Sequence, residues 1–256
     1  FVYGLSQAAP GGVAELVHVD TATGAQTNFA NLGVIPGTNS VNGLASVLGT
    51  GRFFFAVGTK FYGYDHFAPT DKLTAFSGNL AGLAYNGAWY AGSYYYGTGT
   101  SLRRVTVTGA TTFTDTLVKT FSQNFGNLGD LTFNTTSTNA GDGTVYMSNG
   151  AGFYKYNVLT DTTTVINASL PAMQLGFAQD NSLYGVESGG TTATVERVFR
   201  IDLTTGLRNE ISTFANGASV YVRDAATAPT PPVPEPASLA IVGVGLAALR
   251  RRKARA

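Results

Sequence analysis

Cysteine is missing from this 256-residue chain, so disulfide bonds and thiolate metal sites play no part in its fold. Histidine is almost as scarce: with only His18 and His66 in the chain, a zinc site would need carboxylates from other parts of the sequence. Charged residues account for 12% of the chain, about half the usual share, and Thr, Ser, Asn and Gly supply the polar surface instead. The protein is therefore indifferent to the redox state of its compartment.

Motifs typical of catalytic or phosphate-binding sites are absent as well. The sequence has no Gly-x-Ser-x-Gly elbow, no phosphate-binding glycine loop and no His-Glu-x-x-His motif. We expect His18 on a strand surface and His66 in a turn, neither as a metal ligand. Residues 139–144 offer oxygen ligands but lack the dense acidic spacing of a calcium loop, so a polar hairpin loop is expected there. No cofactor or metal is predicted.

The few charges are unevenly distributed. Five of the 16 lysines and arginines, and only one of the 15 acidic residues, lie beyond residue 228, so the preceding body carries about three net negative charges. A mildly acidic body argues against nucleic-acid binding. The sequence starts at Phe1 rather than at methionine, and we expect that a secretory signal was cleaved or lies upstream.

A repeat of 43 to 49 residues organises the body. Residues 18–24 and 200–206 are near copies, in which an alternating strand ends in Asp and a Thr-Gly turn follows. Related strands lie between them, and the gaps are 45, 43, 49 and 45 residues when the series is anchored on Val19, Tyr64, Val107, Tyr156 and Ile201. Two further series keep the same step, one resembling Gly-Leu-Ala-aromatic and the other rich in Tyr and Phe.

Each unit is therefore expected to hold four strands, and four strands in about 45 residues is the period of a β-propeller blade. The first unit lacks its innermost strand. A further strand is expected at residues 218–223, after the last complete unit, and it has no partner strands of its own. We predict an all-β fold of five four-stranded blades over residues 1–226, closed by this C-terminal strand, which would remove two sheet edges. The alternatives are an incomplete sixth blade and a β-sandwich, which does not require a period.

The channel of such a propeller is where a pair of catalytic acids would lie. In the predicted alignment the start of each innermost strand faces the channel, and these positions are Gly43, Gly82, Asp130, Gln174 and Ala218. One acid is present, whereas glycoside hydrolysis normally needs a facing pair. Glu187 or Asp224 could be recruited as the partner, but Asp130 is expected to cap a loop. We predict a protein that is not an enzyme, with a secreted glycoside hydrolase as the alternative.

An aromatic segment is the most unusual part of the body. It contains Trp89, Tyr90, Tyr94, Tyr95 and Tyr96. Strand alternation would bury half of these rings between blades, and the others are expected on a long loop. Planar rings with hydroxyl groups suit sugar stacking or protein contact. The segment is therefore a possible ligand patch, with blade packing as the simpler explanation.

The last part of the chain differs from everything before it. A proline-rich linker (227–236) cannot continue a helix or a sheet. An uncharged run (237–249) follows, short of a full membrane span at ~1.5 Å per residue. The chain then ends in a cluster of cations, which favour the cytoplasmic side of a membrane, formed by Arg250, Arg251, Arg252, Lys253 and Arg255. A membrane-engaging helix is expected in 237–256, with a disordered basic tail as the alternative.

This layout resembles the PEP-CTERM sorting signal of exported bacterial proteins, with Pro234, Glu235 and Pro236 as the motif. The resemblance implies export to the cell envelope or beyond, transient or anchoring contact with the inner membrane, and an exosortase as processing partner. It also implies an extracellular-matrix or biofilm role, because the signal is associated with bacteria that make exopolysaccharide. We therefore expect a non-enzymatic propeller scaffold that binds exopolysaccharide or a surface protein.

Overall fold

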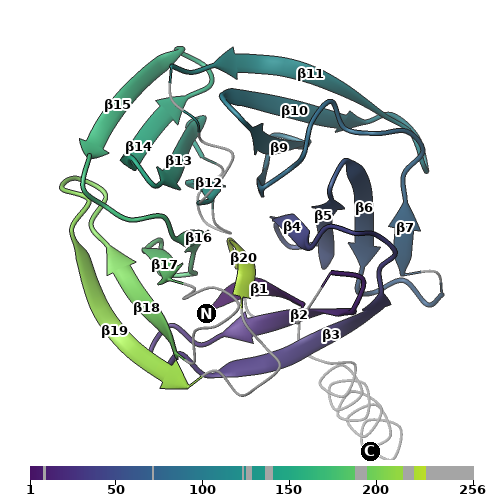
Figure 1. The fold of residues 1–256 in the computed structure, drawn as a ribbon, viewed down its shortest axis with the longest axis horizontal. Coiled ribbons are helices and arrows are strands. Elements are labelled where there is room, and N and C mark those ends of the chain that lie inside the picture. The colour runs from purple at the N-terminus through teal and green to yellow at the C-terminus, as the bar shows by residue number, and fades with distance from the viewer. Residues whose placement is uncertain are drawn as a thin grey trace, which may run out of the picture.

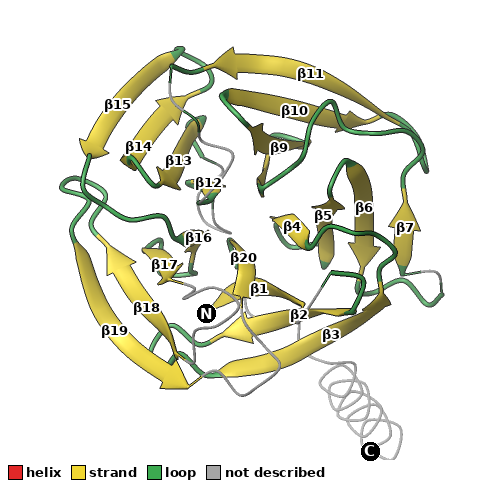
Figure 2. Ribbon diagram, in the orientation of Figure 1, coloured by secondary structure: helices red, strands yellow, loops and turns green. Residues whose placement is uncertain are grey.

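The computed structural model describes residues 1–7, 10–70, 72–122, 124, 129–135, 141–187, 195–215 and 222–228. Within these ranges, twenty strands form five antiparallel four-stranded sheets around a central axis (Figure 1). Each sheet is one blade, so the prediction of an all-β propeller with five blades is confirmed. Strands and loops make up this part of the chain (Figure 2). Among the described residues, no helix has the length and apolar character needed to span a membrane.

The strands of each blade run from the channel outward. Blade 1 holds β20 (Val222–Ala226), β1 (Val2–Gln7), β2 (Val13–Val19) and β3 (Gln26–Val34). Blade 2 holds β4 (Val41–Val47), β5 (Arg52–Val57), β6 (Lys60–Asp65) and β7 (Leu73–Ala75). Blade 3 holds β8 (Asn86–Tyr90), β9 (Ser93–Thr98), β10 (Ser101–Val107) and β11 (Phe113–Thr120).

Blades 4 and 5 follow the same order. Blade 4 holds β12 (Leu131–Phe133), β13 (Thr144–Asn149), β14 (Gly152–Asn157) and β15 (Thr162–Asn167). Blade 5 holds β16 (Gln174–Phe177), β17 (Leu183–Glu187), β18 (Val195–Ile201) and β19 (Arg208–Ala215). The expected hairpin at 139–144 is described only from residue 141, and Asp142 there accepts a bond from the backbone N–H of Thr144.

The C-terminal strand closes the ring, as predicted. β20 pairs with β1 and places Asp224 opposite Leu5 and Ala226 opposite Tyr3. β20 extends to Ala226, three residues beyond the predicted end at 223, and residues 218–221 lie outside the described part. Closure pairs β1, at the start of the chain, with β20, near its other end. The edges at which these two strands meet are therefore hydrogen-bonded and not open.

The Asp-Thr-Gly turns form because the side chain of Asp bonds the backbone ahead of it. In blade 1 the carboxylate of Asp20 accepts the backbone N–H groups of Ala22 and Thr23, each at 2.8 Å, and Gly24 follows at a φ of 72°. In blade 5 the carboxylate of Asp202 accepts those of Thr204 and Thr205 at 2.8 and 2.7 Å, and the glycine that follows has a φ of 66°. The near-copy in the sequence is thus a near-copy in geometry.

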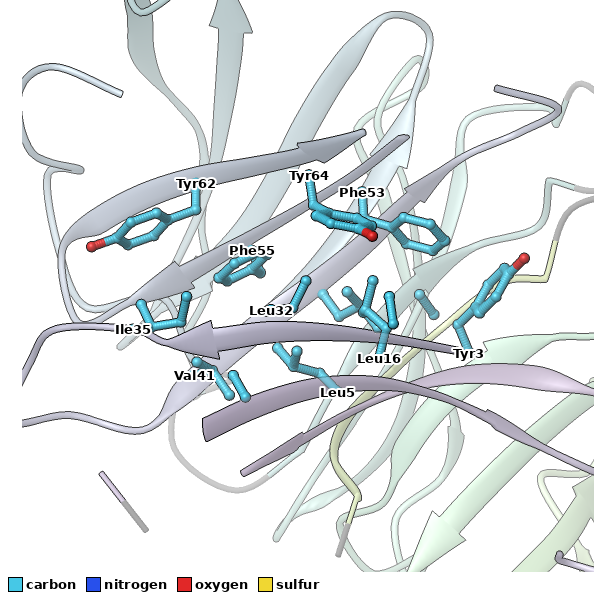
Figure 3. Packing of buried hydrophobic residues seen from close by; sticks show 14 of the residues in the cluster. Tyr3, Leu5, Leu16, Leu32, Ile35, Val41, Phe53, Phe55, Tyr62 and Tyr64 are labelled. Atoms are coloured by element: carbon cyan, nitrogen blue, oxygen red, sulfur yellow. The ribbon is translucent and has the colours of Figure 1, made fainter. Parts of the chain in front are cut away.

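The core lies between the blades, because each strand alternates its side chains between two neighbours. In β5, Phe53 and Phe55 pack toward blade 1, whereas Phe54 packs toward blade 3. Figure 3 shows the first of these interfaces, where aromatic rings of blade 2 meet aliphatic side chains of blade 1 such as Leu5 and Leu16. Burial of one such ring contributes ~1.5–3 kcal/mol relative to leaving it exposed. The abundance of aromatic residues is therefore explained by packing between blades.

Blade 3 departs from the predicted alignment. Residues 82–85, which match the Gly-Leu-Ala-aromatic series, precede the blade and form no strand. They belong to a connection that crosses the β5–β6 turn of blade 2, where Leu80 and Ala84 donate backbone hydrogen bonds to Thr59 and Gly58. The innermost strand is β8 instead, which moves Trp89 to the first strand of its blade.

Candidate functional site

The channel holds two acidic residues rather than one. Asp130 directly precedes β12 and Asp224 lies within β20, and their exposed fractions are 1% and 0%. Their carboxyl groups hydrogen-bond to each other. We call them the channel pair. Ala218, the channel residue predicted for this strand, lies outside the described residues, and within β20 it is Asp224 that contacts the channel residue Asp130.

Each acid of the channel pair also bonds the backbone on both sides of a blade junction. The carboxylate of Asp224 accepts from its neighbour Ala225 at 2.9 Å and from Leu44 in blade 2 at 2.6 Å. Asp130 repeats this arrangement, because it accepts from Leu131 at 2.6 Å and from Leu175 in blade 5 at 2.8 Å. The pair therefore connects blades 1, 2, 4 and 5. Asp130 was expected to cap a loop on its own, whereas it bonds the backbone of two strands, β12 and β16, together with a partner.

Blade 3 joins this network through Tyr94, which is fully buried. Its hydroxyl donates to the carbonyl of Gly43 at 2.7 Å. Gly43 has a φ of 70°, and a Cβ at this position would lie 2.3 Å from the Tyr94 hydroxyl oxygen, so only glycine fits. Burial raises the pKa of Tyr94 well above its usual value, and the nearby charges of Asp224 and Asp130 add to the effect.

The protonation state of the channel pair follows from its surroundings. Burial and the neighbouring Asp224 carboxylate raise the pKa of Asp130 well above its usual range. Burial also raises the pKa of Asp224, to about 7, although its hydrogen bonds favour the charged form. Two carboxyl groups in direct contact share a proton, since both cannot ionise side by side. Among the described residues no group of three His, Asp or Glu side chains could hold a metal ion.

The channel pair does not have the geometry of a glycosidase. The acids of retaining and inverting enzymes stand about 5–9.5 Å apart, which leaves room for a sugar and a water. Here the two acids bond each other and the backbone and are closed off from solvent. A cavity at the other end of the inner strands measures about 10 Å³, lined by Ser46, Thr132 and Thr227 among others, which is room for one water at most. Glu187 is not recruited, because it pairs with Arg208 at 3.2 Å.

The aromatic segment is a pair of neighbouring strands, not a loop. Tyr94, Tyr95 and Tyr96 lie in β9 and are at most 5% exposed, and Tyr90 at the end of β8 is 9% exposed. Their rings alternate between the two blade interfaces, which corrects the expectation of a long loop with outward-facing rings. Trp89 is the exception, because it is only partly buried and packs flat against Phe54.

The two histidines lie where they were expected, and near each other. His18 is in β2 and His66 is in the β6–β7 turn, and the ring of Phe29 stacks between them at 4.7 and 4.4 Å. Burial lowers the pKa of both histidines. A phenyl ring between two imidazoles keeps them from sharing a metal, so the pair belongs to the packing of blades 1 and 2.

The predicted sorting motif and basic end lie outside the described residues, and a comparison with known families tests them instead. Residues 232–253 match the PEP-CTERM protein-sorting motif. The chain carries a PEP-CTERM signal. The match includes Pro234, Glu235 and Pro236 and all of the cations except Arg255. A PEP-CTERM signal implies export, sorting to the cell surface and processing by an exosortase.

The body that precedes the PEP-CTERM signal resembles solved structures at low sequence identity. One chain of a nidogen–laminin complex is 11% identical, with a TM-score of 0.56 over 88% of this chain and 98% of that one. A protein of unknown function from Bacteroides thetaiotaomicron is 14% identical, with a TM-score of 0.52 over 86% of this chain and 59% of its own. At such identities the likeness shows the fold alone. No curated protein matches the sequence.

Sequence reasoning named Asp224 only as an acid that could be recruited and aligned Ala218 with the channel, although the sequence contained a signal for Asp224. In Asp130-Leu131-Thr132 and in Gly43-Leu44-Ala45 an apolar residue and a small one follow the channel position, and Asp224-Ala225-Ala226 has the same order. Alignment on this triplet, rather than on the following strand, would have placed Asp224 in the ring. Nothing in the sequence indicates that its side chain contacts Asp130, since contact depends on the diameter of the closed ring.

Proposed function

We propose that this protein is a non-enzymatic scaffold of the bacterial cell surface or extracellular matrix, and that its propeller binds extracellular polysaccharide. The observation that carries the proposal is the PEP-CTERM match at 232–253, attached to a propeller through a proline-rich linker. A semi-rigid linker of this kind holds a domain away from the membrane. The body then acts outside the cell, where polysaccharide is the abundant partner.

The closed channel supports a scaffold rather than an enzyme. Its two acids bond each other and the backbone of four inner strands, β4, β12, β16 and β20, and they are closed off from solvent. A catalytic acid must instead reach its substrate within hydrogen-bond distance. The alternative is a secreted glycoside hydrolase. It predicts that Asp130→Asn abolishes the release of reducing sugar from a susceptible polysaccharide, whereas the scaffold predicts no such release by the wild-type chain.

Localisation is tested in a bacterium that has an exosortase, with the full chain expressed behind an export leader. We expect the wild type in the envelope or matrix fraction, and we expect deletion of 234–256 or triple alanine substitution of Pro234, Glu235 and Pro236 to abolish its retention there. The folded body should be recovered in the medium or periplasm. Unchanged retention of both variants would show that the tail does not sort the protein.

Binding is tested separately, by affinity electrophoresis of the full chain through gels that contain exopolysaccharide purified from the same bacterium. We expect retardation in these gels and none in gels without polysaccharide. Retention by surface proteins alone would assign the propeller to a protein partner instead.

A further inference from the structure

A groove lies at the junction of blades 2 and 3, on the face of the propeller that carries the β4–β5, β6–β7 and β10–β11 turns. Its volume is about 210 Å³. Blade 2 contributes Thr50, Arg52, Asp65 and Lys72 to its lining. Blade 3 contributes Trp89 and the β10–β11 turn at Gly109 and Ala110. We call this the Trp89 groove. Here the partly exposed member of the aromatic segment, Trp89, lies beside charged side chains.

The indole of Trp89 is held in a fixed orientation. Phe54 stacks against it with ring centroids 4.9 Å apart and an angle of 7° between the planes. The backbone is equally constrained, because Trp89 pairs with Tyr94 in the sheet of blade 3. In the described part of the chain no hydrogen bond involves the indole N–H, and this group is not among the buried unpaired polar atoms. The ring is thus preorganised, and its one donor is free for a ligand.

The polar groups around the ring are exposed and weakly engaged. Arg52 and Asp65 form an ion pair with an N–O distance of 3.5 Å, and their side chains are 59% and 37% exposed. Such a surface pair contributes about 0–1 kcal/mol, so a ligand can replace either partner at little cost. Lys72 is exposed as well and has no ion pair within the described ranges. The rim therefore offers charged donors and a charged acceptor within one small area.

We propose that the Trp89 groove binds a single sugar ring of a polysaccharide. A pyranose has a flat C–H face that can lie against an indole, and hydroxyl groups around its edge that both donate and accept hydrogen bonds. Charge-assisted bonds from Arg52 and Lys72 and to Asp65 match that edge. The groove, with a volume of about 210 Å³, has room for one such ring. The proposal rests on the proposed polysaccharide-binding function and adds its location.

The sequence provides a reporter for this groove, because Trp89 is the only tryptophan in the chain. We would titrate the full chain with dextran, mannan, alginate and the purified exopolysaccharide of the host, and with the corresponding monosaccharides, and follow tryptophan emission. A saturable change in emission intensity or wavelength with at least one polymer is expected. A change with free sugars and none with any polymer would overturn the assignment to polysaccharide.

Substitutions test whether the charged residues of the Trp89 groove contribute to binding and whether other surface charges do not. Arg52→Met and Lys72→Met keep the tryptophan, and we expect each to weaken the titrated binding ~10-fold, the loss of about one charge-assisted hydrogen bond. Trp89→Phe should weaken retardation in the polysaccharide gel. Lys119→Met is the matched control, since Lys119 pairs with Asp161 at 2.7 Å on another surface, and its affinity should be unchanged.

The failure of this site can be distinguished from failure of the proposed function. If a polysaccharide retards the protein while emission stays constant and all three groove variants bind as the wild type does, the groove is wrong and polysaccharide binding stands. If no polysaccharide retards the wild type, polysaccharide binding itself is wrong, and the groove with it.

Discussion

The channel pair and the Trp89 groove are both places where acidic groups lie beside aromatic rings, yet they are used in opposite ways. In the channel, Asp130 and Asp224 are at most 1% exposed, and their oxygens bond the backbone of neighbouring strands. In the groove, Asp65 is 37% exposed and its contact with Arg52 is long. Polar groups whose hydrogen bonds are made within the protein hold the blades together. Polar groups that the fold leaves to solvent remain available to a ligand.

This difference explains why the carboxylates in the channel do not indicate catalysis. Propellers converge on their axis, so any acid at the start of an inner strand meets its counterparts from other blades. Whether such a cluster of acids can be a catalytic site depends on the other groups to which the carboxyl groups bond. Here the pair accepts backbone N–H groups from Leu44, Ala225, Leu131 and Leu175, and both carboxyl groups are buried away from solvent.

The largest effect is expected from removal of one member of the channel pair. Asp224→Ala would leave the N–H of Leu44 without a partner and Asp130 without its neighbour, at a cost of about 3 kcal/mol in the free energy of unfolding. Asp65→Ala, at the groove, should cost only about 1 kcal/mol, from the exposed ion pair and the bond that its carboxylate accepts from the N–H of Phe67. Urea unfolding of both variants would test this, and an equal loss would remove the distinction between the two regions.

A substitution at Gly43 tests the same comparison through the backbone of the channel. Gly43→Ala adds a Cβ that would lie 2.3 Å from the Tyr94 hydroxyl, at a φ of 70°. Gly92→Ala is the matched control, because Gly92 has a φ of 78° and no atom within 4 Å of the added Cβ. The control should cost ~1–2 kcal/mol from backbone strain alone, and Gly43→Ala should cost about 2 kcal/mol more. Equal unfolding midpoints would mean that the Tyr94 contact does not constrain the channel.

The channel pair should also make stability depend on pH. An acid whose pKa is raised in the folded state stabilises the fold fully below its unfolded pKa, near 3.8 for Asp, and this contribution is lost as the pH rises through the folded value. For Asp224, with a pKa of about 7, stability should fall between about pH 4 and pH 7, at up to ~1.4 kcal/mol per pH unit and proton. Asp224→Asn, which cannot ionise, should flatten the dependence of the unfolding midpoint on pH. An unchanged profile would contradict the shared proton.

Much of the fold could be predicted from the sequence because strand alternation and turn chemistry act locally. The Asp-Thr-Gly turns at residues 20 and 202 keep a period that fixes the number of blades, and the strand without a unit indicates closure. The alignment failed at Gly82, where a connection that packs on blade 2 has the same residue pattern as an inner strand. Local sequence cannot separate these two, since the hydrogen-bond partners of the connection belong to another blade.

The sites were less predictable for the same reason. The aromatic segment could be recognised as unusual, but which rings face solvent depends on the strand in which each lies. Trp89 and Tyr94 are cross-strand partners that pack in the same cluster between blades 2 and 3, but the indole of Trp89 lines the groove, whereas the hydroxyl of Tyr94 reaches Gly43 in the channel. Arg52, Asp65 and Lys72 carried no signal in the sequence, because two strands and a turn of blade 2 bring them to a groove completed by blade 3.

Arg52→Met is expected to change the free energy of unfolding least of these variants and yet to weaken sugar binding. Arg52→Met removes a guanidinium that is 59% exposed and whose ion pair spans 3.5 Å, so the unfolding midpoint should move by no more than the equivalent of ~0.5 kcal/mol. Its methionine side chain keeps the apolar stem of arginine and the packing that this stem provides. The same variant should lose ~10-fold in sugar affinity, because the charged donor faces the ligand and not the fold. Parallel urea unfolding and tryptophan titration of this one variant test both statements. A loss of stability as large as that of Asp224→Ala would place Arg52 in the framework of the fold, and the groove would then be no more open to ligands than the channel.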